Sequence, residues 1–297
     1  MADSVLHRLR QLLPGLSAAE ARVAHAIMDD PKRIVDLTIT ELAKECGTSQ
    51  ATVARFCQTI GYSGYRDFRL ELASATSREQ AERDRFSVAD GQIDLTDSTE
   101  DVIAKIAYQE VRAIEDTAKA LDPHVLDSAV GALTRAKRID IVGYGSSGLT
   151  AADLQQKLNR IGLPTQFFAD PHVGVASAAL QGPGGVVVGI SHSGLTIDTV
   201  NALEIARKAG ATTVGITNFP DSPLAERCDF VLTTQATENR YRSGAMSSRT
   251  AQLAVVDFLF VRIAQERYGD VTEALRRTYD AVQSQRLPAE RRRNGKA

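Results

Sequence analysis

The chain has few cysteines, and their spacing does not suit a metal site. Its three cysteines, Cys46, Cys57 and Cys228, are scattered over 297 residues, and no two of them form a C-x-x-C pair. Zinc sites and dithiol redox centres use closely spaced cysteines, so we expect neither a metal ion nor a cofactor. An odd number of scattered thiols is typical of proteins that stay in the reducing cytoplasm.

Long apolar runs are also absent. Residues 1–16 contain no continuous apolar stretch, which argues against a signal peptide. The longest apolar-rich run, Leu253 to Ile263, includes Asp257 and Arg262 and is too short to span a bilayer. We therefore expect a soluble, cytoplasmic protein with no membrane partner.

The chain carries no large excess of charge of either sign. It has 35 basic and 37 acidic residues and a formal net charge of −2, so no global basic field indicates a nucleic-acid partner. A DNA-reading surface, however, only has to be locally basic. The length suggests about two domains, and the 43% hydrophobic content is enough for each to bury a core.

The hydrophobic periodicity changes along the chain and indicates several domains. Residues 1–78 show short helical patterns, and the polar stretch 79–98 indicates a linker whose helical content stays open. Residues 99–285 alternate helical patterns with apolar strand runs, which predicts a parallel sheet covered by helices in three α/β layers. Residues 286–297 form a basic tail. The expected strands are Ile139–Val142, Val186–Ile190, Thr213–Ile216 and Phe230–Leu232.

Two short helices joined by a tight turn are predicted between Ile39 and Ile60. The first ends near Gly47, where the turn needs a positive φ, and Ser49 caps the second. A second helix that follows such a turn can lie in the major groove of DNA. The buried stripe expected on this second helix is Val53, Phe56, Cys57 and Ile60.

The opposite face of the second helix is polar and neutral to basic. Arginine and glutamine suit bidentate contacts with guanine and adenine edges, while a nearby arginine can contact phosphate. The alternative is a plain helical hairpin, because many chains contain pairs of short helices. The residues that we expect to contact DNA are Ser49, Gln50, Thr52, Arg55, Gln58 and Arg66.

Two polar, glycine-containing turns follow predicted strands. The first, Gly143–Gly148, fits G-x-G-x-x-G and has Asp170 downstream, which taken alone would favour a dinucleotide site. The second, Ser191–Thr196, is left unexplained by that interpretation. Hydroxyls and backbone N–H groups at two helix N-termini can form a neutral cradle for a phosphate, or can merely cap helices. The expected ligand-binding residues are Gly145, Ser146, Ser147, Ser191, His192, Ser193, Gly194 and Thr196.

These strings resemble a known family. Thr40–Ala43, Gly47–Phe56 and Ile60–Phe68 are similar to the helix-turn-helix domain of RpiR-type regulators. Ile141–Ser147 and Gly189–Thr196 resemble the sugar isomerase (SIS) domain, found both in phosphosugar isomerases and in RpiR-type regulators. The order of the two domains resembles the regulators over nearly the whole chain.

The resemblance implies a transcription regulator of carbohydrate metabolism genes. Its partners would be operator DNA, read by a homodimer or homotetramer, and a phosphorylated sugar or sugar acid as effector. It also implies that Glu238 contacts the ligand, because SIS isomerases can hold a catalytic base in this region of the chain. An ion pair of Glu238 with Arg240 or Arg242 stays open as the alternative. His172 is a further residue for which a ligand contact or a structural role stays open. We expect no catalytic residue, and the alternative is a phosphosugar isomerase with a helical appendage.

Overall fold

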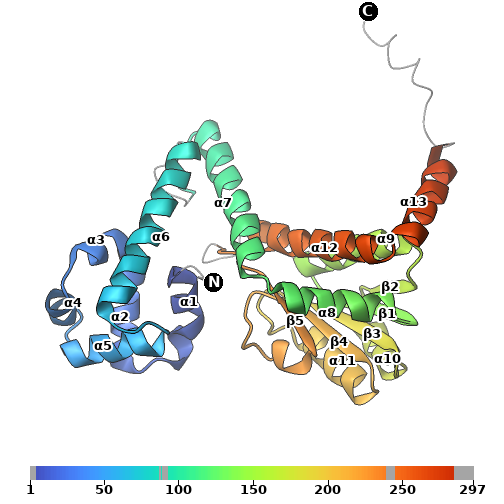
Figure 1. Ribbon diagram of the computed structural model, residues 1–297, viewed down its shortest axis with the longest axis horizontal. Coiled ribbons are helices and arrows are strands. Elements are labelled where there is room, and N and C mark those ends of the chain that lie inside the picture. Colours follow the sequence, from blue (N-terminus) through green and yellow to red (C-terminus); the bar gives the residue numbers. More distant parts are fainter. Residues whose placement is uncertain (1–4, 87, 89–92, 239–244, 284–297) are drawn as a thin grey trace, which may run out of the picture. The chain divides into compact units, whose positions relative to one another are not determined.

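The computed structural model describes residues 5–86, 88, 93–238 and 245–283, which form two units (Figure 1). The described part of the first unit comprises residues up to 120 together with the segment 235–238. The second unit comprises residues 121–234 and those from 245 onward. Helices build the first unit, and a parallel sheet with helices builds the second, as the sequence predicts.

The helices of the first unit begin at side-chain caps. Ser17 and Glu20 form a capping box at the start of one helix, and Thr38 and Glu41 form another. Such caps satisfy backbone N–H groups that have no partner within the helix. The helices are α1 (Val5–Leu12), α2 (Ala18–Asp29), α3 (Pro31–Asp36), α4 (Ile39–Glu45), α5 (Gln50–Thr59), α6 (Tyr65–Phe86) and α7 (Thr99–Ala120), with the short 3₁₀ helix η1 (Leu13–Gly15).

One apolar core joins α1–α5 to the first turns of α6. The predicted stripe of α5 is fully buried, which confirms the period expected from the sequence. Phe56 of α5 packs edge-on against Phe68 of α6, with ring centroids 6.3 Å apart. Burial of one such side chain stabilises the fold by about 1.5–3 kcal/mol. Leu72, one turn further along α6, is also fully buried in this core.

The helix α6 extends eight residues, 79–86, into the predicted linker 79–98, whose helical content the sequence left open. The next helix, α7, was expected to open the second domain. Its contacts instead place it in the first unit, where it packs against α6. The second unit begins at Leu121, and polar contacts such as the one between Glu79 and Arg112 join α7 to α6. The predicted start of the ligand-binding domain at residue 99 stays a prediction.

The second unit contains a five-stranded parallel sheet of order β2-β1-β3-β4-β5. Its strands are β1 (Arg138–Gly143), β2 (Thr165–Phe168), β3 (Gly185–Ile190), β4 (Thr212–Thr217) and β5 (Phe230–Thr233). Four of these match the expected strands. The sequence analysis missed β2, a four-residue edge strand without the continuous apolar run of the buried central strands.

Helices cover both faces of this sheet and give the expected three layers (Figure 1). The larger core lies between the sheet and α8, α9 and α12, and the smaller one lies between the sheet and α10 and α11. These helices are α8 (Pro123–Thr134), α9 (Ser146–Arg160), α10 (Pro171–Ala179), α11 (Ile197–Lys208), α12 (Met246–Glu266) and α13 (Tyr268–Gln283), with the 3₁₀ helix η2 (Ala225–Arg227).

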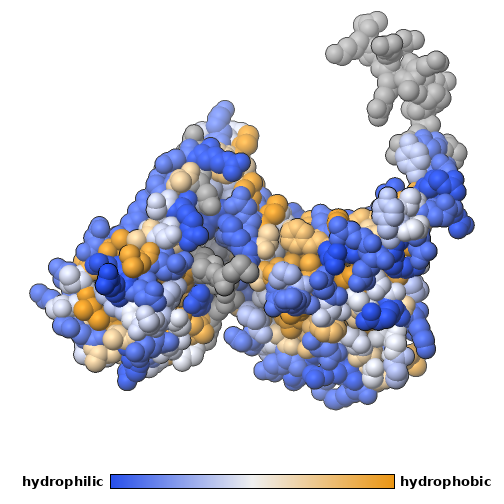
Figure 2. Space-filling model, viewed as in Figure 1, coloured by the Kyte–Doolittle hydropathy of each residue, from blue (hydrophilic) through white to orange (hydrophobic). Residues whose placement is uncertain are grey.

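Hydrophobic residues on the visible surface form patches among hydrophilic ones (Figure 2). Among the described residues, no helix combines the length and the apolar character that a membrane span requires. The predicted basic tail, 286–297, lies outside the described residues.

Candidate functional site

The turn between α4 and α5 is held by a side chain from α2. Gly47 has a φ of +58°, the left-handed conformation that the sequence predicts at this position. Arg22 donates from Nε to the carbonyl oxygen of Cys46 at 3.0 Å and from a terminal nitrogen to that of Gly47 at 3.2 Å. Arg22 thus ties the turn between α4 and α5 to α2. The sequence analysis did not predict this contact.

Three of the residues predicted to contact DNA also stabilise the start of α5. Ser49 caps the helix by accepting a hydrogen bond from the backbone N–H of Thr52 at 3.1 Å, and the two hydroxyl oxygens lie 3.0 Å apart. Gln50 donates from Nε2 to the hydroxyl of Thr40 on α4 at 3.0 Å. These contacts leave the side chains exposed or half-buried, so they orient polar groups at the surface of the turn.

Arg55 extends from α5 beside an acidic residue of α2. Its Nε lies 3.8 Å from Oε1 of Glu20, and 67% of the arginine side chain is exposed. Hydrogen bonds from Ser17 and Thr59, together with the charge of Arg55, lower the pKa of Glu20 against the opposing effect of burial. Glu20 is therefore ionised near neutral pH and pairs with Nε of Arg55, whose side chain is otherwise exposed.

The remaining predicted DNA contacts, Gln58 on α5 and Arg66 on α6, are exposed. Arg69, which lies one turn after Arg66, is instead half-buried and donates to the carbonyl oxygen of Leu37 at 3.4 Å. The exposed face of α5 thus retains one arginine and one glutamine able to contact base edges, and α6 adds a second arginine.

We predict that Arg55→Ala weakens binding to a preferred DNA site by about 1–3 kcal/mol, the cost of losing one bidentate base contact. Electrophoretic or anisotropy titrations with selected and with random DNA measure this change. Arg78→Ala is the control, because Arg78 on α6 is also largely exposed and ion-paired, to Glu71. Equal affinities of wild type and Arg55→Ala on both kinds of DNA would exclude Arg55 from the interface.

In the second unit, the first glycine turn brings α9 close to the end of β1. A Cβ atom on Gly143 would lie 3.0 Å from the carbonyl oxygen of Ser147 and 3.2 Å from that of Ile190. Gly145 has a φ of +60°, and a Cβ on Gly148 would lie 3.1 Å from the carbonyl oxygen of Gly143. Only glycine fits this turn without displacement of backbone, so the helix begins directly at the strand end.

The two predicted serines of this turn have different surroundings. Ser147 accepts a hydrogen bond at 3.2 Å from Nε2 of Gln252 on α12, and Thr150 donates to the other end of that amide at 3.3 Å. The Ser146 hydroxyl oxygen is buried and has no hydrogen-bond partner among the described residues. Buried hydroxyls normally have a partner, so Ser146 is the group of this turn that an anion would satisfy.

The second turn is fixed mainly by its backbone. Ser191 donates its N–H to the carbonyl oxygen of Ile216 at 3.0 Å. The hydroxyl oxygens of Ser191 and Thr196 lie 3.0 Å apart, and the Ser193 hydroxyl accepts the N–H of Leu195 at 3.2 Å. The hydroxyls of Ser191, Ser193 and Thr196 thus all lie on this one short loop.

His192 and Gly194 are held by neighbouring segments. The buried His192 ring packs edge-on against Phe219, with centroids 5.8 Å apart, so it belongs to the packing of the loop. Gly194 has a φ of +65°, and a Cβ atom there would lie 2.1 Å from the hydroxyl oxygen of Ser222. The carbonyl oxygen of Gly194 accepts the N–H of Leu224 at 3.1 Å. The sequence analysis missed these supporting residues because they follow β4, far along the chain.

The two turns follow adjacent strands at the point where the strand order reverses. Gly143 at the end of β1 pairs in register with Ile190 at the end of β3. The strand that follows β1 in sequence lies on one side of it, and β3 lies on the other. Such a topological switch point is where open α/β sheets bind ligands. Both α9 and α11 lack a side-chain cap, so backbone N–H groups of their first turns can donate to an anion.

Two predicted residues lie outside these turns. His172 is exposed in the first turn of α10, which follows β2. Glu238 belongs to the segment 235–238, which groups with the first unit. In this segment Gln235 donates its N–H to the hydroxyl of Thr117 on α7 at 2.9 Å. A ligand contact by Glu238 stays a prediction.

A helix-turn-helix unit followed by an α/β unit with polar turns at its switch point is the arrangement expected of a transcription regulator with an SIS domain. The family model for the rpiR-type helix-turn-helix domain matches residues 3–79, and the SIS domain model matches residues 132–262. The chain belongs to the RpiR family of transcriptional regulators.

Similar proteins span nearly the whole chain. An uncharacterized HTH-type transcriptional regulator from Caldanaerobacter subterraneus subsp. tengcongensis is 36% identical over 283 residues, which cover 95% of this chain and 98% of the relative. One from Haemophilus influenzae is 31% identical over 288 residues, covering 96% and 99%. The structure of the Vibrio vulnificus NanR protein complexed with ManNAc-6P matches with a TM-score of 0.61 and 29% identity, covering 96% of this chain and 100% of that one.

Proposed function

We propose that the DNA binding of this regulator is controlled by a phosphorylated sugar or sugar acid, which binds at the ends of β1 and β3. The observation that carries the proposal is the pair of helix N-termini without side-chain caps, which follow adjacent strands. The buried hydroxyl of Ser146, the first residue of α9, has no hydrogen-bond partner among the described residues. Backbone N–H groups and hydroxyls there can hold a phosphate without a lysine. The family of the chain, and the sugar phosphate in the NanR structure, support a ligand of this class.

The proposal assigns DNA binding to the surface around α5. A symmetric dimer would present two such helices to a palindrome with half-sites about one helical turn apart. The effector would act by binding with different affinity to the DNA-competent and DNA-incompetent arrangements. We propose that the protein acts as a homodimer or homotetramer and that its targets are genes of carbohydrate metabolism. The proposed ligand-binding residues are those of the two turns together with Glu238. DNA titrations with and without the effector decide whether it raises or lowers the affinity for DNA.

A screen of sugar phosphates tests this proposal. The panel contains glucose 6-phosphate, fructose 6-phosphate, 6-phosphogluconate, N-acetylglucosamine 6-phosphate and N-acetylmannosamine 6-phosphate, with inorganic phosphate and the unphosphorylated sugars as controls. A compound present at a hundred times its Kd stabilises the folded protein by about 2.7 kcal/mol, which raises Tm by about 5–10 °C. If no phosphorylated sugar or sugar acid shifts Tm or DNA binding, the effector is of another class.

The same panel separates the regulator from the alternative of an isomerase. A coupled assay of aldose–ketose interconversion should show no turnover of the compound that binds most tightly, because an effector has to persist. Turnover that Glu238→Gln abolishes would establish Glu238 as a catalytic base and favour the isomerase.

A further inference from the structure

Buried polar groups lead from the second turn to the end of β5. The carbonyl oxygen of His192 accepts the N–H of Asn218 at 3.0 Å, and Oδ1 of Asn218 accepts the hydroxyl of Thr234 at 3.2 Å. One peptide bond further, the N–H of Gln235 donates to the hydroxyl of Thr117 on α7 at 2.9 Å. Thr234 and Thr117 are fully buried, and Asn218 is 2% exposed. A loop shift at His192 therefore acts on a chain of groups that lose their partners if they move independently.

The hydrogen bond between Gln235 and Thr117 lies directly after the point where the chain passes from the second unit to the first. Thr234 still belongs to the second unit, where its N–H donates to the carbonyl oxygen of Thr217 at 2.9 Å. Gln235 already groups with the first unit, where α7 supplies its partner. Consecutive residues of the segment after β5 are thus each held by a backbone N–H bond, Thr234 to the end of β4 and Gln235 to α7. A displacement of this segment has to reach α7 or break a buried hydrogen bond.

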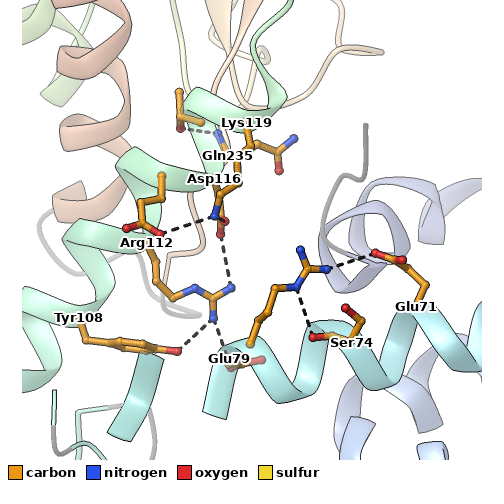
Figure 3. A network of polar contacts seen from close by, with 11 residues as sticks. Glu71, Ser74, Glu79, Tyr108, Arg112, Asp116, Lys119 and Gln235 are labelled. Carbon is orange, nitrogen blue, oxygen red and sulfur yellow. Dashed lines mark hydrogen bonds and ion pairs between the residues drawn. The ribbon is translucent and has the colours of Figure 1, made fainter. Parts of the chain in front are cut away.

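Polar contacts tie α7 to α6 along the same stretch (Figure 3). Arg112 lies 3.3 Å from Oε1 of Glu79 on α6 and donates to the hydroxyl of Tyr108 at 3.1 Å. Asp116, 3.4 Å away, is its second acidic partner. Burial works to lower the pKa of Arg112, but Tyr108, Asp116 and Glu79 outweigh it, so the pKa is raised. Arg83 adds a further contact to Glu79 at 2.6 Å.

The helix α6 continues from this network into the core of the helix-turn-helix domain. It is a single helix of 22 residues. Phe68 and Leu72 in its first two turns are fully buried in that core, and Phe68 packs on Phe56 of α5. The Tyr65 hydroxyl donates to the carbonyl oxygen of Leu37 at 2.9 Å. The orientation of α6 is therefore fixed to that of α5, on which the predicted DNA contacts lie.

We propose that the α6–α7 hairpin transmits occupancy of the sugar-phosphate site to the helix-turn-helix domain. The Thr117–Gln235 hydrogen bond links the segment after β5 to α7, and the Glu79–Arg112 ion pair links α7 to α6. The inference rests on the proposed function, because it needs an effector in the turn of Ser191–Thr196. It adds two positioning residues, Thr117 and Glu79, that contact neither ligand nor DNA. Changes at such residues alter the coupling between two sites by about 2- to 30-fold.

The test measures coupling as the ratio of DNA affinities with and without the compound from the panel above that raises Tm most. Thr117→Val keeps the shape of the side chain and leaves the Gln235 N–H without its acceptor. It should lower the coupling by about 2- to 30-fold, while the Kd of the compound and the Kd of ligand-free protein for DNA stay at their wild-type values. Thr117→Ser, which keeps the hydroxyl, should restore the coupling.

A second variant and two controls make the result decisive. Glu79→Gln removes the charge that faces Arg112 and should lower the coupling in the same way. Thr76→Val and Glu115→Gln are the matched controls, because Thr76 bonds within α6 and Glu115 pairs with Lys119 on the surface of α7. Both should respond as wild type does.

Three outcomes count against the inference. If Thr117→Val and Glu79→Gln both keep full coupling, the hairpin does not transmit the signal, although the proposed function stands. If Thr117→Val does not fold by circular dichroism, retained coupling in Glu79→Gln has the same meaning. A wild-type protein that binds DNA equally with and without every compound of the panel removes the proposed function and this inference together.

Discussion

Replacing Gly194 with alanine should destabilise the second unit and abolish sugar-phosphate binding. The new Cβ atom would lie 2.1 Å from the hydroxyl oxygen and 2.3 Å from Cβ of Ser222, a buried residue that has little room to move. Overpacking of this kind costs about 1–3 kcal/mol, and a left-handed conformation of a non-glycine residue costs about 1–2 kcal/mol more. A shift of the loop away from Ser222 would also strain the hydrogen bond from the Leu224 N–H to the Gly194 carbonyl oxygen.

Gly162→Ala is the matched control for this experiment. Gly162 also has a positive φ, +79°, but a Cβ atom there meets no atom within 4 Å. Only the backbone cost of about 1–2 kcal/mol remains, which lowers Tm by a few degrees. Thermal unfolding and calorimetric titration of the full chain measure both effects. Equal Tm values for the two variants, with ligand binding retained in Gly194→Ala, would contradict the close contact between the loop and Ser222.

Replacing Ser193 should act on the ligand with little effect on stability. Its hydroxyl accepts the N–H of Leu195 and can donate to a phosphate in the same loop. Ser193→Ala removes one donor to a charged acceptor, worth roughly 1.5–3 kcal/mol, so sugar-phosphate affinity should fall about tenfold or more. Ser193→Asp should abolish binding, because a carboxylate would repel the phosphate at contact distance. Isothermal titration calorimetry measures both.

The control for Ser193 is Ser128→Ala. The Ser128 hydroxyl donates to the carbonyl oxygen of His124 within α8, so its loss should leave sugar-phosphate affinity unchanged. DNA affinity without ligand should equal that of wild type in all three variants. Wild-type affinity of Ser193→Asp for the sugar phosphate would place the effector elsewhere.

Much of the fold could be predicted from the sequence, because local chemistry determines it. The cap at Ser49, the left-handed Gly47 and the buried stripe of α5 follow from neighbouring residues. The apolar runs of the four strands β1, β3, β4 and β5 are also local signals. The edge strand β2 gave no such signal, since it is short and has one exposed and one half-buried residue.

The domain boundary and the supports of the site depend on contacts between distant residues. Glu79 and Arg112 join α6 to α7 across 33 positions, and no period of the sequence indicates that pairing. The neighbours of the predicted site residues were hidden for the same reason. Glu20 beside Arg55, and Gln252 beside Ser147, come from other helices. The types of residue in the two turns were readable, whereas the difference between the bonded Ser147 and the unpartnered Ser146 was not.

Titration of DNA binding against effector concentration tests the central claim most directly. DNA enriched from a random pool by the wild-type protein is titrated at several concentrations of the panel compound that binds most tightly. We expect the DNA affinity to change by about 5- to 150-fold, and the Ser193→Ala protein to need about ten times more compound for the same change. An unchanged DNA affinity at saturating compound, or an identical response of wild type and Ser193→Ala, would contradict control of DNA binding by a sugar phosphate in these turns.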